Sequence, residues 1–201
     1  MPLITEPYRL QQGRWPASGR HILAQFDDST IVVYQAYKPA IGHFAARHGY
    51  FGGAFSFERM SWIKTNFLWM MYRSGWGTKI DQEVTLAIRL QRAAFDELLA
   101  LAVPSSFDGQ RFPDRAAWQD AVARSEVRQQ WDPDHDPAGA KQQRRAIQLG
   151  LRGAVLARYA RDWIVEIEDI SGFVAEQRGR SIVDLITPRE EVYPFGPASD
   201  S

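Results

Sequence analysis

The chain has 201 residues, of which 45% are hydrophobic and 24% charged, so it can bury a core without disulfides or a structural metal. Lys and Arg together number 24, as do Asp and Glu, and this net charge of zero disfavours nucleic acid as the main partner. There is no cysteine, which excludes disulfides, thiolate metal sites and a cysteine nucleophile.

The two ends of the chain differ in composition from the middle. Residues 1–19 are polar and hold glycine and proline, so we expect a loosely held N-terminal arm. Residues 188–201 are rich in proline and are expected to form a C-terminal tail on the surface, which leaves one domain at residues 20–187. The start has no signal-peptide pattern and no run is apolar enough to span a membrane, so we expect a cytoplasmic protein with no membrane partner.

Strands and helices are expected to mix along the domain. Residues 30–37 are rich in β-branched and aromatic residues, which indicates a buried strand. Residues 66–73 are apolar on nearly every side, which indicates a central buried helix. In chain order, the expected strands are residues 30–37, 84–90, 127–131, 145–151 and 163–170, and the expected helices are residues 39–48, 66–73, 92–101, 115–123, 154–162 and 173–178.

The order of these elements indicates an α+β fold. Strict βαβ alternation is absent, and no Gly-rich dinucleotide fingerprint follows the first strand. We therefore expect a single domain with a mixed or antiparallel sheet and packed helices. One buried cluster is expected to contain Val33, Phe67, Leu68, Trp69, Met71, Leu86, Ile88, Ile147, Leu149, Ile164 and Ile167.

Residues 59–79 are the main candidate for a ligand site, because four cations, three tryptophans and a tyrosine fall within this segment. Cations beside a buried segment need anionic partners, and the phosphates of a nucleotide could provide them while a tryptophan face receives the base. Together with two residues at the end of the first strand, the candidate ligand-binding residues are Tyr34, Gln35, Arg59, Trp62, Lys64, Tyr72, Arg73 and Trp76. The alternative is that Arg59 pairs with Glu58 or another carboxylate and that the tryptophans belong to the core.

Other polar clusters give weaker signals. Residues 131–136 hold three carboxylates and a histidine, but they lack the glycine and closing glutamate of a calcium loop, so we interpret them as a solvated loop. His43 and His48 are five residues apart and do not share the face of a zinc-binding helix. Gln35 would need two or more hydrogen bonds if buried, and it could instead face solvent. We expect no metal site, and no catalytic residue can be assigned.

Several segments resemble a bacterial and fungal family known as domain of unknown function number 4291. The resemblance runs in order from about residue 21 to residue 169, and its most specific part is the string FLWMMYRSGW at residues 67–76. Thr65 and Asn66 stand where the family has Pro and Ser. Asn, like Ser, can cap a helix, so this difference keeps the capping side chain. The other matching segments are residues 31–37, 59–64, 86–88, 130–133 and 147–151. This family implies no established activity.

The order of elements is also similar to the split-sheet fold of ADP-ribosyltransferases and RNA 2′-phosphotransferases. That resemblance implies NAD as a substrate, with Tyr34 and Gln35 on the first site strand and Arg59, Lys64 and Arg73 facing phosphates. It supplies no catalytic glutamate, because Glu166 and Glu168 come late in the chain and Gln130 or Gln148 would be a non-standard substitute.

The functional expectation is a domain that binds a nucleotide-like small molecule and carries out ADP-ribosyltransferase-type transfer. No cofactor is needed for the structure. The alternative is a non-catalytic module that binds nucleotides or single-stranded nucleic acid through stacked tryptophans. A structural or partner-binding domain is the third reading, and the oligomeric state stays open.

Overall fold

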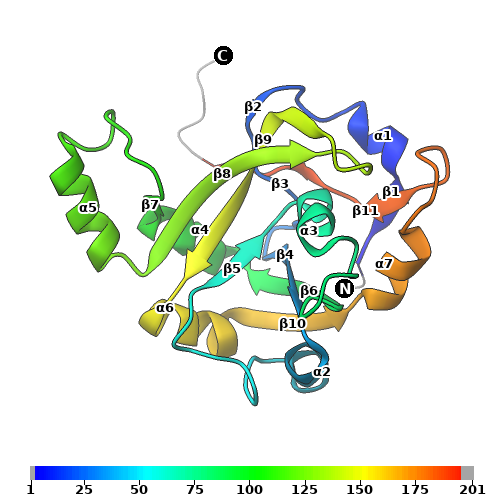
Figure 1. The fold of residues 1–201 in the computed structure, drawn as a ribbon, viewed down its shortest axis with the longest axis horizontal. Coiled ribbons are helices and arrows are strands. Elements are labelled where there is room, and N and C mark those ends of the chain that lie inside the picture. Colours follow the sequence, from blue (N-terminus) through cyan, green and yellow to red (C-terminus); the bar gives the residue numbers. More distant parts are fainter. Residues whose placement is uncertain (1–2, 196–201) are drawn as a thin grey trace.

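The β-branched run Thr30–Tyr37 forms strand β4 inside an eight-stranded sheet in the computed structural model, which describes residues 3–195 (Figure 1). Hydrogen bonding runs continuously through this sheet, and its pairs are antiparallel except β2 with β9 and β7 with β8. On one side of β4 lie β6 (Val84–Gln91) and then β10 (Ile164–Asp169) at the edge. On the other side follow, in order, β5 (Ser61–Lys64), β9 (Lys141–Leu151), β8 (Val127–His135) and β7 (Val103–Pro104). Strand β2 (Gly19–Arg20) also pairs with β9.

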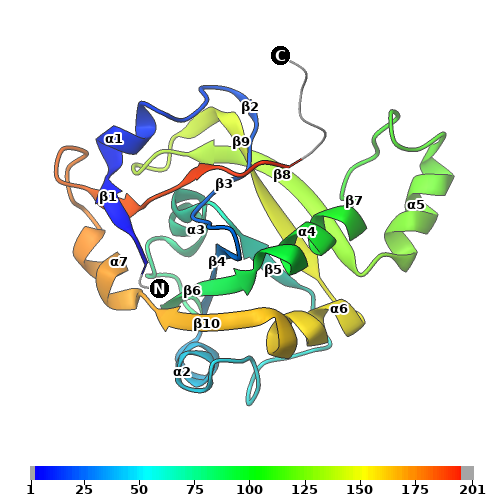
Figure 2. The same cartoon turned by 180° about the vertical axis from the view of Figure 1, so that it is seen from behind.

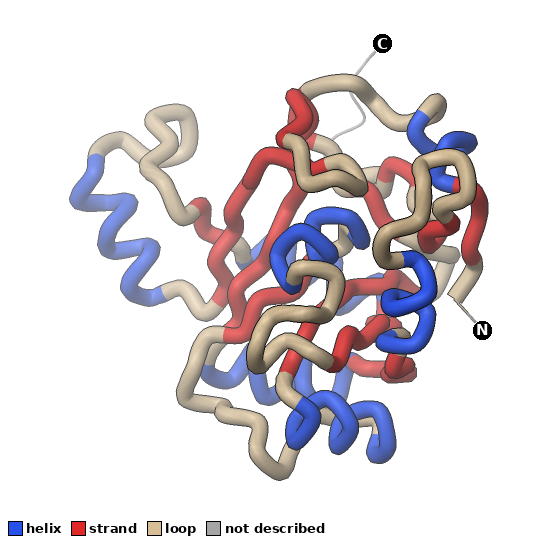
Figure 3. Tube along the Cα trace, turned by 45° about the vertical axis from the view of Figure 1, so that its right-hand side comes forward, coloured by secondary structure: helices blue, strands red, loops and turns tan. Residues whose placement is uncertain are grey.

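Helices cover both faces of the sheet, and the chain is an α+β domain as expected. Helix α3 (Phe67–Ser74) lies on the face turned to the viewer in Figure 1, and α4 (Arg92–Leu101) crosses the opposite face, seen in Figure 2. The other helices are α1 (Tyr8–Gln12), α2 (Pro39–His48), α5 (Arg115–Arg124), α6 (Gly153–Arg158), a π-helical turn at Tyr159–Trp163, and α7 (Ser171–Gln177). Helix α5 stands away from the rest at the end of its loop (Figure 3). No helix in residues 3–195 is long and apolar enough to cross a membrane.

The apolar side chains form two clusters, so the expectation of one cluster was wrong. Side chains alternate across a strand, so neighbours in β4 enter different clusters: Val33 lies in the first and Tyr34 in the second. The first cluster also holds Leu86, Ile88, Ile147, Leu149 and Ile167, with Ile164 packed against it. The second holds Phe67, Leu68 and Met71. Trp69 is buried but belongs to neither cluster, because it faces a pocket described below.

The ends of the domain are more tightly held than expected. Strand β1 (Thr5–Pro7) pairs with β11 (Ile186–Pro188), and Tyr8 and Gln11 are buried, so residues 5–12 are not a loose arm. At the other end β12 (Glu191–Val192) pairs with β3 (Leu23–Ala24), and Glu190 and Tyr193 are buried inside the expected surface tail. Long-range pairing of this kind leaves little local trace in sequence. Residues 196–201 of that expected tail lie outside the described part of the chain.

The interpretation of residues 131–136 as a solvated loop was also wrong. Strand β8 continues through Pro133, where the register with β9 shifts, and reaches His135. Asp134 is buried and accepts a hydrogen bond from Arg144 Nε at 2.8 Å, and Tyr72 stacks on the buried His135 ring with 3.6 Å between centroids. A bulge allows a proline within a strand, which is why the break predicted at Asp132 and Pro133 does not occur.

Candidate functional site

A pocket of about 860 Å³ opens where β4, β5, α3 and the facing strands β8 and β9 meet. Its apolar wall contains Trp62, Trp69, Met60 and Met70, and its charged residues are Lys38, Arg59, Lys64, Arg73 and Asp81. Its uncharged polar residues are Gln35, Tyr37, Ser56, Ser61, Gln82, Gln130 and Gln148. The volume lies in the range of about 300–1,000 Å³ that is typical of small-molecule sites.

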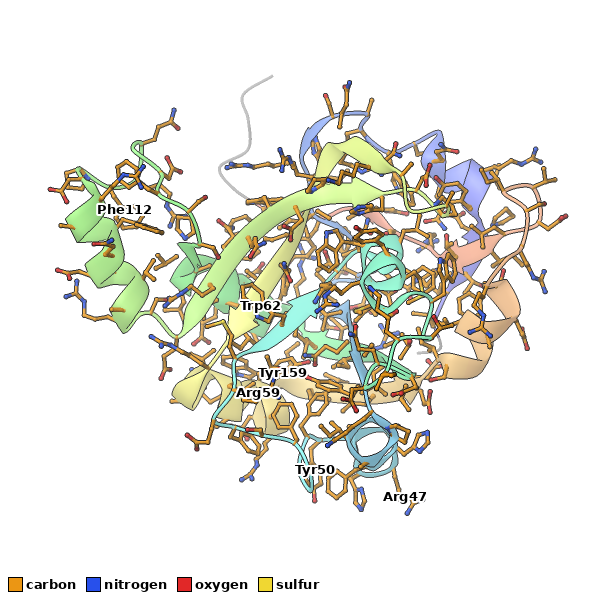
Figure 4. The ribbon with its side chains drawn as sticks, viewed as in Figure 1. Arg47, Tyr50, Arg59, Trp62, Phe112 and Tyr159 are labelled. Carbon is orange, nitrogen blue, oxygen red and sulfur yellow. The ribbon has the colours of Figure 1, made fainter. Side chains whose placement is uncertain are left out.

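The pocket brings together five of the eight candidate residues named from the sequence. Gln35, Arg59, Trp62, Lys64 and Arg73 all line it. Figure 4 labels Arg59 on the stretch of chain that leads into β5 and Trp62 within β5. Segments that are far apart in the sequence therefore supply the polar groups and the aromatic rings of one pocket.

The other three candidates lie elsewhere. Tyr34 alternates with Gln35 along β4, so it points to the opposite face, where its ring packs on Phe67. Trp76 also packs edge-on against Phe67 and is partly buried against the second cluster. Tyr72 is on the outer side of α3, stacked on His135. Their aromatic side chains support the packing of α3 and are not among the pocket residues.

The sequence around α3 explains how the cations reach the pocket. The Asn66 side chain caps the helix by accepting from the Trp69 amide at 2.7 Å, and Gly75 ends it in the left-handed conformation. Residues three and four apart share a helix face, so Trp69 and Arg73 face the pocket together while the opposite face enters the core. Lys64, the last residue of β5, comes just before this cap.

Lys64 is nearly buried, with an exposed fraction of 6%. Its amine lies 5.0 Å from the centre of the Trp69 ring, a cation–π distance. Burial and the positive charge of Arg73 both lower the pKa of Lys64, the negative charge of Asp132 opposes them, and the result is a pKa of about 7. The Asp132 carboxylate is already held by the side-chain amides of Gln130 at 2.8 Å and Gln148 at 2.6 Å. The Asp132 oxygens therefore accept hydrogen bonds from uncharged amides, and Asp132 forms no ion pair with Lys64 at 4 Å or less.

Arg59 and Arg73 are exposed at the same pocket. Within residues 3–195 neither guanidinium, nor the Lys64 amine, has a carboxylate at ion-pair distance. Glu58, the neighbour that could have paired with Arg59, does not do so. The pocket therefore carries a local excess of positive charge on a chain with zero net charge.

Gln35 is buried and fully hydrogen-bonded. Its side-chain nitrogen is 2.8 Å from the Tyr37 hydroxyl, 2.9 Å from Ser61 Oγ and 3.1 Å from the Trp62 carbonyl oxygen. Its side-chain oxygen accepts from the Tyr159 hydroxyl at 2.7 Å. Burial raises the pKa of Tyr37 and Tyr159, so both stay protonated. This network fixes the end of β4 against the start of β5.

Sequence reasoning missed part of the pocket. Ser61, Gln130 and Gln148 were not among the candidate ligand-binding residues, and they line it. Gln130 and Asp132 are two residues apart, so in a strand they share one face, and this spacing could have indicated a polar site. The interpretation of residues 131–136 as a loop obscured it. Glu166 and Glu168 lie on β10 and do not line this pocket. No group of three His, Asp or Glu side chains arranged to hold a metal occurs in the described part of the chain.

No curated protein matches the chain. A family model described as domain of unknown function (DUF4291) matches residues 21–193. This match covers most of the chain and includes β4, β5, α3, β8 and β9, the elements that carry the pocket. The chain therefore belongs to the DUF4291 family.

Proposed function

We propose that the pocket binds a nucleotide, with its phosphates at Arg59 and Arg73 and its base against the exposed part of Trp62. One observation carries this proposal: two guanidinium groups and a buried amine converge on one concave site, and none has a carboxylate partner in residues 3–195. Gathering like charges is unfavourable unless an anion meets them. Guanidinium groups match phosphate oxygens in charge and in geometry.

The rest of the pocket also suits a nucleotide. An indole face and the Met60 side chain offer an apolar surface for a base. The side-chain amide of Gln82 can hydrogen-bond to a sugar, while the hydroxyls of Tyr37 and Ser61, which also line the pocket, already bond each other and Gln35. NAD is the first nucleotide to test, because the resemblance to ADP-ribosyltransferases implies it. ADP-ribosyl transfer itself is the finer hypothesis and would need a carboxylate, for which Asp81 is the residue that lines the pocket.

Single-stranded nucleic acid is the weaker alternative. A strand-binding surface needs a long positive groove with a series of exposed aromatic rings. Here the candidate cations line one pocket, while Trp76 is partly buried against the second cluster and Trp69 is nearly buried. A single bound nucleotide explains this arrangement better than a bound strand does.

A thermal-shift titration with NAD, ADP-ribose and ATP tests the proposal. A ligand at about 100 times its Kd should stabilise the native state by about 2.7 kcal/mol. Arg73→Ala should remove this shift, and because Arg73 is exposed it should change the stability of the free protein by only about 0.5 kcal/mol. Arg47→Ala, on the exposed end of α2, is the matched control and should keep the full shift (Figure 4).

Two results would contradict the proposal. One is the absence of any shift with all three nucleotides at millimolar concentration. The other is a loss of about 3–5 kcal/mol in the free protein on Arg73→Ala, which would mean that Arg73 is a structural ion-pair partner.

A further inference from the structure

The environment of Lys64 differs from that of every other lysine in the protein. The chain has only four lysines, and Lys38, Lys79 and Lys141 are exposed. Lys64 alone is buried, with an exposed fraction of 6%. Burial of an amine without an ion pair is costly, so this arrangement calls for an explanation beyond folding.

The geometry around Lys64 disfavours a permanent positive charge. Its amine contacts the Trp69 ring on one side, and Arg73 from α3 adds a like charge. Asp132 on β8 is the nearby group of opposite sign, but its two oxygens already accept from glutamine amides. With the pKa of Lys64 lowered to about 7, much of this amine is neutral at neutral pH. The nitrogen lone pair is then free to react.

We propose that Lys64 is a nucleophilic amine that condenses with the carbonyl carbon of a phosphorylated aldehyde bound in the pocket. The lone pair of Nζ adds to the carbonyl carbon, and the electron pair of the C=O bond moves to oxygen. A proton passes from nitrogen to oxygen, and the adduct loses one water to leave a C=N bond. Atoms and electrons balance without an oxidant or a reductant.

The phosphate requirement comes from the neighbours of Lys64. Arg73 and Arg59 line the same pocket, so a phosphate held there places an attached aldehyde near Nζ. This part of the inference rests on the proposed nucleotide function, since a nucleotide with a free reducing sugar carries both a phosphate and, in its open form, an aldehyde. ADP-ribose is one such compound.

Reductive trapping tests the inference. The protein is incubated at pH 7 with pyridoxal 5′-phosphate, reduced with borohydride, and digested so that mass spectrometry locates the modified lysine. The neutral fraction of Lys64 at this pH is about 10³-fold that of an ordinary lysine. We expect Lys64 to be modified about 10-fold or more faster than Lys38, the exposed lysine of the same pocket.

Three variants and one competitor sharpen the result. Lys64→Arg should abolish the fast labelling and leave only slow labelling of exposed lysines such as Lys38, and Lys141→Arg, at an exposed site outside the pocket lining, should keep the fast labelling. Arg73→Ala, or pyridoxal in place of its phosphate, should slow labelling of Lys64. Should Lys64→Arg fail to fold, the rate of labelling of the wild-type protein still reports on Lys64, because it should rise with pH through about 7. Added ADP-ribose should protect Lys64.

The outcomes separate the two proposals. Labelling of Lys38, Lys79 and Lys141 in preference to Lys64 overturns the role of Lys64, and nucleotide binding stands if the thermal shifts persist. Rapid labelling of Lys64 that no nucleotide prevents supports the nucleophilic amine and contradicts the proposed nucleotide function.

Discussion

Gly150 lies directly opposite Trp62 in the ladder between β9 and β5, and the Trp62 indole occupies the space above it. A methyl group on the Gly150 α-carbon would lie 2.9 Å from Trp62 Cζ2 and 2.6 Å from the Met60 sulfur. Met60 can move aside, but the rigid indole cannot without leaving its place in the pocket. The absence of a side chain at Gly150 on β9 thus makes room for the Trp62 ring of β5 in the pocket.

Gly150→Ala should therefore displace Trp62 and weaken nucleotide binding. We expect a loss of about 1–3 kcal/mol in unfolding free energy from overpacking, and a smaller nucleotide-induced thermal shift. Gly172→Ala is the matched control, because its methyl group would meet no atom within 4 Å. Denaturant unfolding and thermal shift measure both effects. A Gly150→Ala protein with wild-type stability and an undiminished shift would contradict the role assigned to this contact.

The pH dependence of stability should report on Lys64. Its folded pKa of about 7 lies below the ordinary value of 10.5, so between these values the unfolded chain binds more protons than the native state. The free energy of unfolding should then rise with pH across this window, by up to about 1.4 kcal/mol per pH unit from this group. Lys64→Met should flatten that rise. Equal slopes in urea unfolding of the two proteins would argue against the lowered pKa.

Tyr159→Phe should destabilise the network at the floor of the pocket. The substitution removes the donor to the buried Gln35 side-chain oxygen and leaves that oxygen without this partner. The expected cost is about 1–3 kcal/mol in unfolding free energy. Tyr50→Phe, at an exposed tyrosine, should change stability by less than about 0.5 kcal/mol. If both variants match the wild type, the Gln35 network does not contribute to stability.

Leu68→Ala should test the core under α3. Leu68 has an exposed fraction of 3% and packs in the cluster with Tyr34 and Met71. Its truncation should cost about 2–5 kcal/mol through lost burial and a cavity. Ile80→Ala is the control, since Ile80 is 85% exposed and should be nearly neutral. Comparable melting temperatures for the two variants would show that α3 is not packed as described.

Asp134→Ala should loosen the N-terminal segment. Asp134 forms a buried ion pair with Arg144, which also donates to the Pro16 carbonyl at 2.7 Å and lies over the Trp15 ring. Breaking a buried pair on one side costs about 3–5 kcal/mol. Limited proteolysis should then cut near residue 16 sooner than in the wild type. Asp136→Asn in the adjacent turn keeps the ion pair intact, so the protease should cut this variant no faster than the wild type.

Local sequence patterns predicted the strands and helices whose composition, spacing and end residues all lie within a short stretch of chain. Strand β4 and helix α2 have the predicted bounds, and α3 begins and ends at its Asn66 cap and Gly75 stop. The short strands β1, β3, β11 and β12 were missed. Each pairs with a segment more than a hundred residues away, and no local periodicity encodes such pairing.

The pocket was predicted in part for the same reason. The need of cations for anionic partners indicated Arg59, Lys64 and Arg73, which line one pocket. Aromatic character alone could not separate Trp62, which lines it, from Trp76, which is partly buried against the second cluster. That separation depends on which face of each element is covered, and neighbours along the chain do not determine it.

The sequence by itself determined the α+β class, helices α2 to α7 to within a few residues, and the concentration of cations and tryptophans between residues 59 and 79, because these follow from local spacing and side-chain chemistry. Only the tertiary structure decided that Trp62 faces Gly150, that Gln35 is held by Tyr159, and that Lys64 is buried beside Trp69. Those relationships arise when β5 pairs with β4 and β9, which sets the side-chain faces and removes water from the Lys64 amine.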